Sequence, residues 1–332
     1  MAGRITLNRP EALNALTHQM CLDIETALNS WAEDPDVALV LIDAAGDRAF
    51  CAGGDIAKMY ATGTAGDFSY GRRFWQDEYR LNALIARFEK PIISFLHGFT
   101  MGGGVGLGCH AAHRVVCESS QIAMPEVSIG LVPDVGGSLL LARAPGRLGE
   151  YFGLTAARMS AATAITAGFA DHYVPFEDWD GLKRVLIDAG DMAALDTFAK
   201  PPGSVEIEVI TECFAAPKLT DIAAKLAQSA TSAAKDALKR MERHSPLAMA
   251  GALAIIRGQR EGGDIATALR QEYRFTARSM EHGDFLEGIR AQIIDKDKSP
   301  RWRHSMDTLP EEAVERMLAP LGDEELKLED GV

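Results

Sequence analysis

Two carboxylates in an apolar setting constrain this chain more than any other feature. Glu126 and Asp134 lie eight positions apart in the segment 124–137, which has the sequence MPEVSIGLVPDVGG. Isolated among Met, Ile, Leu and Val, a carboxyl group favours its neutral form. A chain that keeps two of them there is typical of enzymes that transfer protons or attack a substrate directly. The structural alternative is a carboxylate that caps a helix or satisfies a turn.

Two glycine clusters precede this segment. One is Cys51–Asp55 (CAGGD) and the other is 101–104 (MGGG), and each is followed by a helix-like stretch. N–H groups at the start of a helix lack an intrahelical acceptor and can point at negative charge. Two such donors on one carbonyl oxygen form an oxyanion hole, in which each donor contributes ~3–4 kcal/mol. Either cluster alone is equally explained by a tight turn. The second cluster lacks the GxGxxG spacing of a dinucleotide site.

The first part of the chain alternates short apolar runs with helical patterns, which favours an α/β architecture. Apolar positions at three- and four-residue spacing predict a helix that Thr17 caps and that continues to about Glu33. Further strands and helices are expected at Arg4–Leu7, Val37–Asp43, Phe74–Phe88, Pro91–Leu96 and Gly103–Ala112.

The last third of the chain has a different pattern. Lys200–Ser204 (KPPGS) indicates a break, and helical periodicity dominates beyond it, in 219–243, 246–261 and 265–281. We therefore expect a catalytic core over residues 1–200 and a helical C-terminal region over residues 201–332.

Charge and cysteine content narrow the function further. The net charge is −13 and the sequence pI about 5.1, so a polyanion such as DNA is repelled on average. Five cysteines without CxxC spacing argue against a disulfide framework or zinc site. No apolar run reaches the ~20 residues that a membrane span needs, and the first ten residues lack a signal peptide's apolar centre. The expected location is cytoplasmic.

These motifs together resemble the enoyl-CoA hydratase/isomerase (crotonase) superfamily. The similarity runs through Ile5–Leu16 (ITLNRPEALNAL), the two glycine clusters, 124–137 and Ala167–Asp171 (AGFAD). It implies an α/β fold built as a spiral of ββα units, with acyl-CoA thioesters as substrates. It also implies that the hole donors are the backbone N–H groups of Gly54 and Gly103. The expected contacts to the CoA part of the substrate are Ala15, Ala52, Asp55 and Ile56.

Within the superfamily, side chains around the hole distinguish hydratases from thioester hydrolases. Hydratases carry a Glu three residues after the second hole glycine, where this chain has Gly106. The second hydratase carboxylate matches Glu126, and the hydratase glycine eight positions later is replaced by Asp134. This combination is similar to the 3-hydroxyisobutyryl-CoA hydrolase family, as is the tail over 282–302. Matching positions in that family imply substrate contacts at Glu78, Gly103, Glu126 and Asp134; for Glu78, an exposed helical residue is the alternative.

The resemblance implies thioester hydrolysis in valine degradation, with Glu126 and Asp134 as catalytic residues. Glu126 either attacks the carbonyl or acts as base on water, and Asp134 either holds the substrate hydroxyl or helps in proton transfer. Enoyl-CoA hydration or isomerisation and a non-catalytic acyl-CoA-binding protein are the alternatives. We expect no metal and no separate cofactor, because CoA is part of the substrate. Superfamily members often form trimers or dimers of trimers, so a homo-oligomer is expected.

Overall fold

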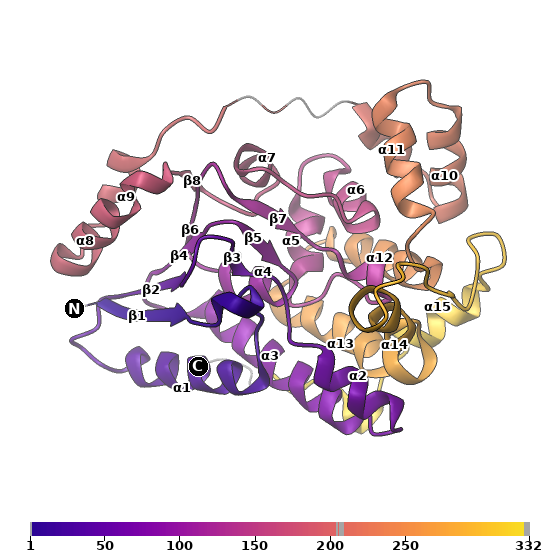
Figure 1. Ribbon diagram of the computed structural model, residues 1–332, viewed down its shortest axis with the longest axis horizontal. Coiled ribbons are helices and arrows are strands. Elements are labelled where there is room, and N and C mark those ends of the chain that lie inside the picture. The colour runs from indigo at the N-terminus through magenta and orange to yellow at the C-terminus, as the bar shows by residue number, and fades with distance from the viewer. Residues whose placement is uncertain (1, 204, 206–208, 329–332) are drawn as a thin grey trace. The chain divides into compact units, whose positions relative to one another are not determined.

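The computed structural model describes residues 2–203, 205 and 209–328, and Figure 1 shows its helices and strands. Two parallel sheets form its β structure. The larger has the strand order β1-β2-β4-β6-β8 and the smaller the order β3-β5-β7. The strands are β1 (Ala2–Leu7), β2 (Leu39–Ala44), β3 (Ala49–Cys51), β4 (Ile92–Leu96), β5 (Phe99–Met101), β6 (His113–Val116), β7 (Gln121–Ala123) and β8 (His172–Tyr173).

The strands recur in pairs along the chain. In each pair the first strand joins the larger sheet and the second joins the smaller: β2 with β3, β4 with β5, and β6 with β7. A helical segment follows each pair, namely α2 (Ala57–Thr64), α4 (Gly103–Gly108) and the 3₁₀ helix η2 (Glu126–Ile129). This order is the ββα repeat that the sequence resemblance implied. The repeat places the ends of β3, β5 and β7 next to one another.

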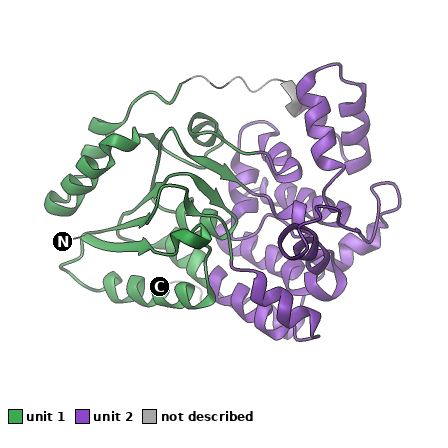
Figure 2. Ribbon diagram, viewed as in Figure 1, with its two compact units in different colours: residues 1–54, 80–123, 158–205 green, residues 55–79, 124–157, 206–332 purple. Residues whose placement is uncertain are grey.

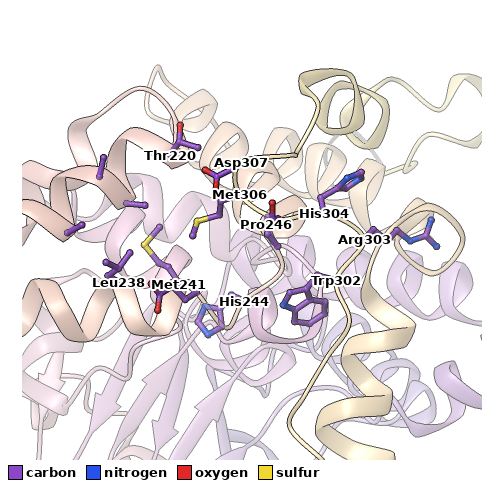
Figure 3. Close-up of a pocket in the computed structure, with 15 residues that line it drawn as sticks. Thr220, Leu238, Met241, His244, Pro246, Trp302, Arg303, His304, Met306 and Asp307 are labelled. Atoms are coloured by element: carbon purple, nitrogen blue, oxygen red, sulfur yellow. The ribbon is translucent and has the colours of Figure 1, made fainter.

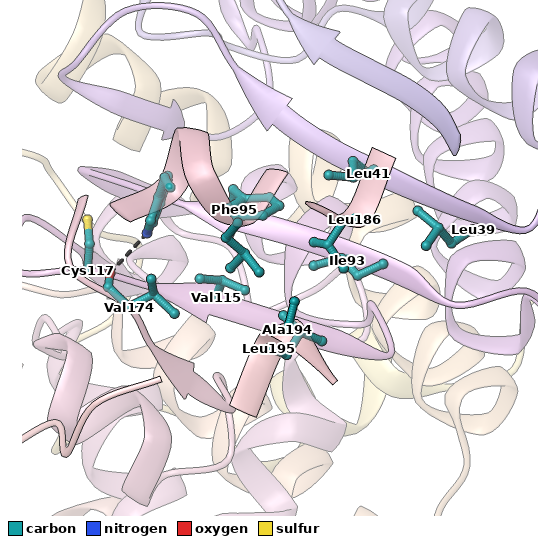
Figure 4. Close-up of a cluster of buried hydrophobic side chains, with 12 residues drawn as sticks. Leu39, Leu41, Ile93, Phe95, Val115, Cys117, Val174, Leu186, Ala194 and Leu195 are labelled. Carbon is teal, nitrogen blue, oxygen red and sulfur yellow. Dashed lines mark hydrogen bonds between the residues drawn. The ribbon is translucent and has the colours of Figure 1, made fainter. Parts of the chain in front are cut away.

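One face of the larger sheet is covered by α8 (Trp179–Ala189) and α9 (Ala194–Phe198). Alternate residues of β2, β4 and β6 face these helices, and Trp179 donates its indole N–H to the carbonyl of Val174 at 2.9 Å (Figure 4). The intervening residues of these strands are also largely buried, as in parallel sheets that are covered on both faces. The continuous apolar runs of the sequence follow from this double burial.

The chain forms two compact units, which Figure 2 shows in different colours. Unit 1 comprises residues 1–54, 80–123 and 158–205 and contains both sheets. Unit 2 comprises residues 55–79, 124–157 and 206–332 and is mainly helical. The units therefore interleave along the sequence. The division into residues 1–200 and 201–332 stays a prediction about domain organisation.

As expected, the described part of the chain after residue 200 is mainly helical, and several further helices precede it. The remaining helices are α1 (His18–Ala32), α3 (Ser69–Arg87), α5 (Gly137–Arg143), α6 (Leu148–Thr155), α7 (Ala161–Thr166), α10 (Leu219–Gln228), α11 (Ser232–Met241), α12 (Pro246–Gln259), α13 (Ile265–His282), α14 (Phe285–Ile289) and α15 (Glu311–Leu318).

Most expected elements lie where the patterns predicted them. The hydroxyl of Thr17 accepts the N–H of Met20 and caps α1, as expected. The helix expected over 103–112 ends at Gly108, because strand β6 begins at His113. The helical pattern of 219–243 contains two helices, since Thr231 caps a new one. Of the predicted break, Ser204 lies outside the described residues.

Candidate active site

The predicted hole donors belong to the ends of neighbouring strands in unit 1. Strands β3 and β5 are parallel partners, with Cys51 opposite Thr100. Gly54 follows the first strand and Gly103 follows the second, so parallel pairing brings the two glycine segments to the same edge of the sheet. Gly103 is the first residue of α4, whose first N–H groups have no acceptor within the helix.

Glycine is required at two positions beside the predicted donor Gly103. Gly102 has φ +49° and ψ −119°, a conformation that residues with a side chain rarely adopt. At Gly104, an added Cβ would lie 2.3 Å from the carbonyl oxygen of Cys51. The close approach packs the first turn of α4 directly onto strand β3. The tight, closely packed turn that the sequence offered as an explanation is therefore present, and the role of Gly54 and Gly103 as hole donors stays a prediction.

Two of the expected CoA contacts lie side by side in unit 1. The segment that contains Ala15 runs beside the end of β3, since Leu16 donates to Gly53 at 2.9 Å and Ala52 donates to Leu13 at 3.0 Å. Asp55 and Ile56 follow Gly54 directly in the chain, at the beginning of unit 2. The structure thus groups Ala15 with Ala52, and the CoA-binding role of all four residues stays a prediction.

The predicted catalytic carboxylates both lie in unit 2 and are buried, with 4% of Glu126 and 5% of Asp134 exposed. Glu126 begins η2, and its carbonyl oxygen accepts the N–H of Leu131 at 3.0 Å. Asp134 lies just before α5. Its Oδ2 accepts a hydrogen bond of 2.7 Å from the hydroxyl of Tyr79, which is also buried.

A further carboxylate, Glu272 of α13, is fully buried and braces the turn after Asp134. It accepts hydrogen bonds from the N–H of Gly136 at 2.8 Å, from the N–H of Ser138 at 3.1 Å, and from the Ser138 hydroxyl. These N–H groups lie at the start of α5, where a carboxylate is favoured by the helix dipole. Glu272 therefore fixes the backbone that carries Asp134.

Glu78 of α3 completes the cluster, with only 3% of the residue exposed. The alternative hypothesis, that Glu78 is an exposed residue on a helix surface, is therefore wrong. Among the described residues, no hydrogen-bond partner reaches the buried Oε1 of Glu78 or the buried Oε2 of Glu126. A buried polar atom without a partner is costly in the folded state, and a bound ligand can supply the missing partner.

Burial sets the proton affinity of this cluster. It raises the pKa of Glu126 and of Glu78 well above the usual range, and the charge of Asp134 raises both further. Burial raises the pKa of Asp134 to about 7, against the lowering effect of the Tyr79 hydrogen bond. Burial also raises the pKa of Glu272 to about 8, although its three donors favour the ionised form. Near neutral pH the cluster can both accept and release protons.

The sequence analysis missed Tyr79 and Glu272. Tyr79 directly follows Glu78, and both lie on the buried side of an amphipathic helix. Glu272 occupies the apolar stripe of α13, three residues after Leu269 and one before Tyr273. A carboxylate within such an apolar stripe could have identified Glu272 as a candidate site residue, because charged residues are rarely buried without a partner.

A separate pocket of about 750 Å³ lies in unit 2 between α10, α11, the start of α12 and residues 302–307 (Figure 3). It shares no residue with the carboxylate cluster. Apolar side chains such as Met241 and Trp302 line it together with charges of both signs, including Arg303 and Asp307. The buried carboxylate cluster and this pocket are therefore separate features of unit 2.

Sequence comparison shows the family. The model of the enoyl-CoA hydratase/isomerase family matches residues 2–318. Similar curated proteins include the chicken protein named 3-hydroxyisobutyryl-CoA hydrolase, mitochondrial, which is 36% identical over 98% of this chain and 89% of its own length. The rat protein of the same name is 38% identical over 98% and 88%.

Solved structures with the same fold have other names. A Rhodobacter sphaeroides protein described as an enoyl-CoA hydratase is 52% identical, with a TM-score of 0.93 over 98% of this chain and 97% of that one. A Mycobacterium thermoresistibile protein described as a carnitinyl-CoA dehydratase is 42% identical, with a TM-score of 0.95 over 99% and 97%. The expected crotonase fold is confirmed, and this chain belongs to the enoyl-CoA hydratase/isomerase family.

Proposed function

We propose that the protein hydrolyses the thioester of 3-hydroxyisobutyryl-CoA to give 3-hydroxyisobutyrate and free CoA. The observation that carries this proposal is the pairing of Glu126 with Asp134 in one buried cluster, while the hydratase position on α4 is Gly106. Hydrolases of this name that are 36–38% identical over nearly the whole chain support it.

In the mechanism that the family implies, backbone N–H groups of Gly54 and Gly103 polarise the thioester carbonyl oxygen. Glu126 then either attacks the carbonyl carbon, which gives an anhydride and releases CoA, or removes a proton from the attacking water. The raised pKa of Glu126 makes it a stronger base than an exposed glutamate once it is ionised. Asp134 holds the substrate hydroxyl or carries a proton.

Hydration of an enoyl-CoA is the second candidate, because the proteins that share 52% and 42% identity are described as a hydratase and a dehydratase. Hydration needs one group that removes a proton from water and one that delivers a proton to carbon. Gly106 supplies neither, although unit 2 contains more than one buried carboxyl group. Proton-transfer groups alone therefore do not separate the two reactions.

One experiment separates thioester hydrolysis from enoyl-CoA hydration. The release of free thiol from 3-hydroxyisobutyryl-CoA is measured beside the loss of enoyl absorbance from crotonyl-CoA, at equal enzyme concentration. The proposal expects efficient thiol release and slow hydration. If crotonyl-CoA is hydrated as fast as thiol is released, or faster, the thioesterase proposal is wrong and the protein is a hydratase.

The context of the reaction belongs to the same proposal. The substrate name places the activity in valine degradation, with an acyl-CoA as small-molecule partner and no metal or separate cofactor. The cytoplasmic location and the homo-oligomer stay predictions. The chicken and rat relatives are named as mitochondrial proteins. No helix in the described part of the chain is long and apolar enough to cross a membrane.

A further inference from the structure

Tyr79 is the one side-chain hydroxyl group that the described hydrogen bonds place on a carboxylate oxygen of Asp134. The bond measures 2.7 Å, a length typical of an O–H group that donates to an ionised carboxylate. Burial and the charge of Asp134 raise the pKa of Tyr79 well above the usual range, so the phenol keeps its proton. Tyr79 is therefore the donor and Asp134 the acceptor.

The surroundings of this pair are acidic. Glu78 on α3, Glu126 on η2 and Glu272 on α13 all act electrostatically with Asp134. Each negative charge opposes ionisation of its neighbours, so the cluster favours placing its first charge where a donor stabilises it. Tyr79 supplies such a donor at Asp134 and the start of α5 supplies donors at Glu272, whereas Oε2 of Glu126 has no partner among the described residues.

We propose that Tyr79 is a positioning residue that fixes the charge and orientation of Asp134, so that Oδ1 of Asp134 accepts the 3-hydroxyl group of the substrate. The hydroxyl of Tyr79 bonds to Oδ2, and each carboxylate oxygen has two lone pairs, so Oδ1 can accept a further donor. An ionised carboxylate accepts only, and it therefore selects an acyl chain that carries a hydroxyl group over one that does not. This inference rests on the proposed function and assigns its substrate selectivity to the Tyr79–Asp134 pair.

The test measures selectivity against pH. For each variant, kcat/KM is determined for 3-hydroxyisobutyryl-CoA and for isobutyryl-CoA from pH 5.5 to 9, and the first value is divided by the second. Both substrates share the titration of Glu126, which cancels in this ratio. In the wild-type protein the ratio is high at alkaline pH and falls as Asp134 becomes protonated, near pH 7.

Tyr79→Phe keeps the ring and removes the hydroxyl group, which donates to Asp134 and also lies 3.4 Å from Oγ1 of Thr276. Loss of a hydrogen bond to a charged group should lower the ratio at pH 7 about tenfold and move its midpoint up by about one pH unit. Replacing Tyr79 with 3-fluorotyrosine strengthens the donor and should move the midpoint down. Asp134→Asn should make the ratio low and independent of pH, with no further loss when Tyr79→Phe is added.

The matched control is Tyr273→Phe. The ring of Tyr273 packs edge-on against that of Tyr79, with ring centroids 6.3 Å apart. The variant also loses a tyrosine hydroxyl group, but one that no described hydrogen bond joins to Asp134. Its ratio and midpoint should equal those of the wild-type protein.

A different result would contradict each of the three hypotheses. If Tyr79→Phe leaves both ratio and midpoint unchanged, or if 3-fluorotyrosine does not move the midpoint, the positioning role of Tyr79 is wrong. If the wild-type protein cleaves both thioesters equally, recognition of the hydroxyl by Asp134 is wrong while the thioesterase stands. If it cleaves neither, the proposed function fails.

Discussion

The two sets of candidate catalytic groups differ in kind. Unit 1 offers backbone N–H groups beside Gly54 and Gly103, whose positions follow from strand pairing and from glycines that pack against β3. Unit 2 offers side chains, namely buried carboxyl groups braced by hydrogen bonds from a tyrosine, a serine and the start of α5. Backbone donors do not titrate near neutral pH, whereas buried carboxyl groups do. The pH dependence of the enzyme should therefore come from unit 2 alone.

The largest effect is expected for Glu126→Gln. The amide keeps the shape of the side chain but is neither a base nor a nucleophile, so kcat should fall at least ~10²–10⁴-fold. Binding of free CoA, measured by calorimetry, should change little. Glu33→Gln, an exposed change at the end of α1, is the control. Activity of Glu126→Gln within a few-fold of the control would remove Glu126 from the mechanism.

Gly103→Val tests the backbone donor in unit 1. The added side chain narrows the space at the start of α4 and turns its N–H group, and one hole donor is worth ~10²–10³ in kcat. The rate should fall at every pH while the apparent pKa values of the profile stay in place. A folded variant with a normal rate would show that this turn is only structural. A shift in the apparent pKa values would show that the pH dependence does not come from unit 2 alone.

Asp134→Asn probes the energetic cost of the acidic cluster. The folded-state pKa of Asp134, about 7, lies above its ordinary value of 3.8. The folded protein therefore binds this proton more tightly, and the contribution of Asp134 to the free energy of unfolding falls as the pH rises from about 4 through 7. Between pH 5 and pH 8 the free energy of unfolding should fall about 1–3 kcal/mol more in the wild-type protein than in the variant.

Urea unfolding at the two pH values gives this difference. Asp188→Asn, a change at an exposed residue of α8, should follow the wild-type protein. An equal loss of stability in the wild-type protein and Asp134→Asn would show that Asp134 does not take up a proton in this range.

The smallest effect is expected for Glu78→Gln. Burial raises the pKa of Glu78 well above its usual range and so favours the neutral acid, and glutamine has nearly the same shape and polarity as that acid. KM should rise about two- to fivefold, the range of one ordinary hydrogen bond, with kcat little changed. A hundredfold loss of kcat would instead mean that Glu78 is ionised and takes part in the reaction.

The sequence predicted the α/β core well, because its strands are apolar on both faces and its helices begin at recognisable caps such as Thr17. It also marked Glu126 and Asp134 as an unusual pair, and both are buried. The roles of these residues stay predictions.

Sequence patterns did not identify the partners of those carboxylates. Tyr79 is 55 positions from Asp134, and Glu272 is 134 positions from Ser138. Such contacts depend on how α3 and α13 pack within unit 2, which periodicity along one helix does not encode. The length of α4 was also overestimated, since the register of β6 against β4 decides where the helix ends.

The hydrogen bonds of Glu272 also bear on how the protein is made. The turn after Asp134 emerges from the ribosome well over one hundred residues before α13, so its brace is missing during most of synthesis. Domains generally acquire their structure as whole units during translation. A nascent or truncated chain that stops before residue 265 would contain every motif recognised in the first two hundred residues, yet it would lack the carboxylate that braces the turn after Asp134. Activity should therefore appear late, as the last helices of unit 2 join those formed from earlier segments.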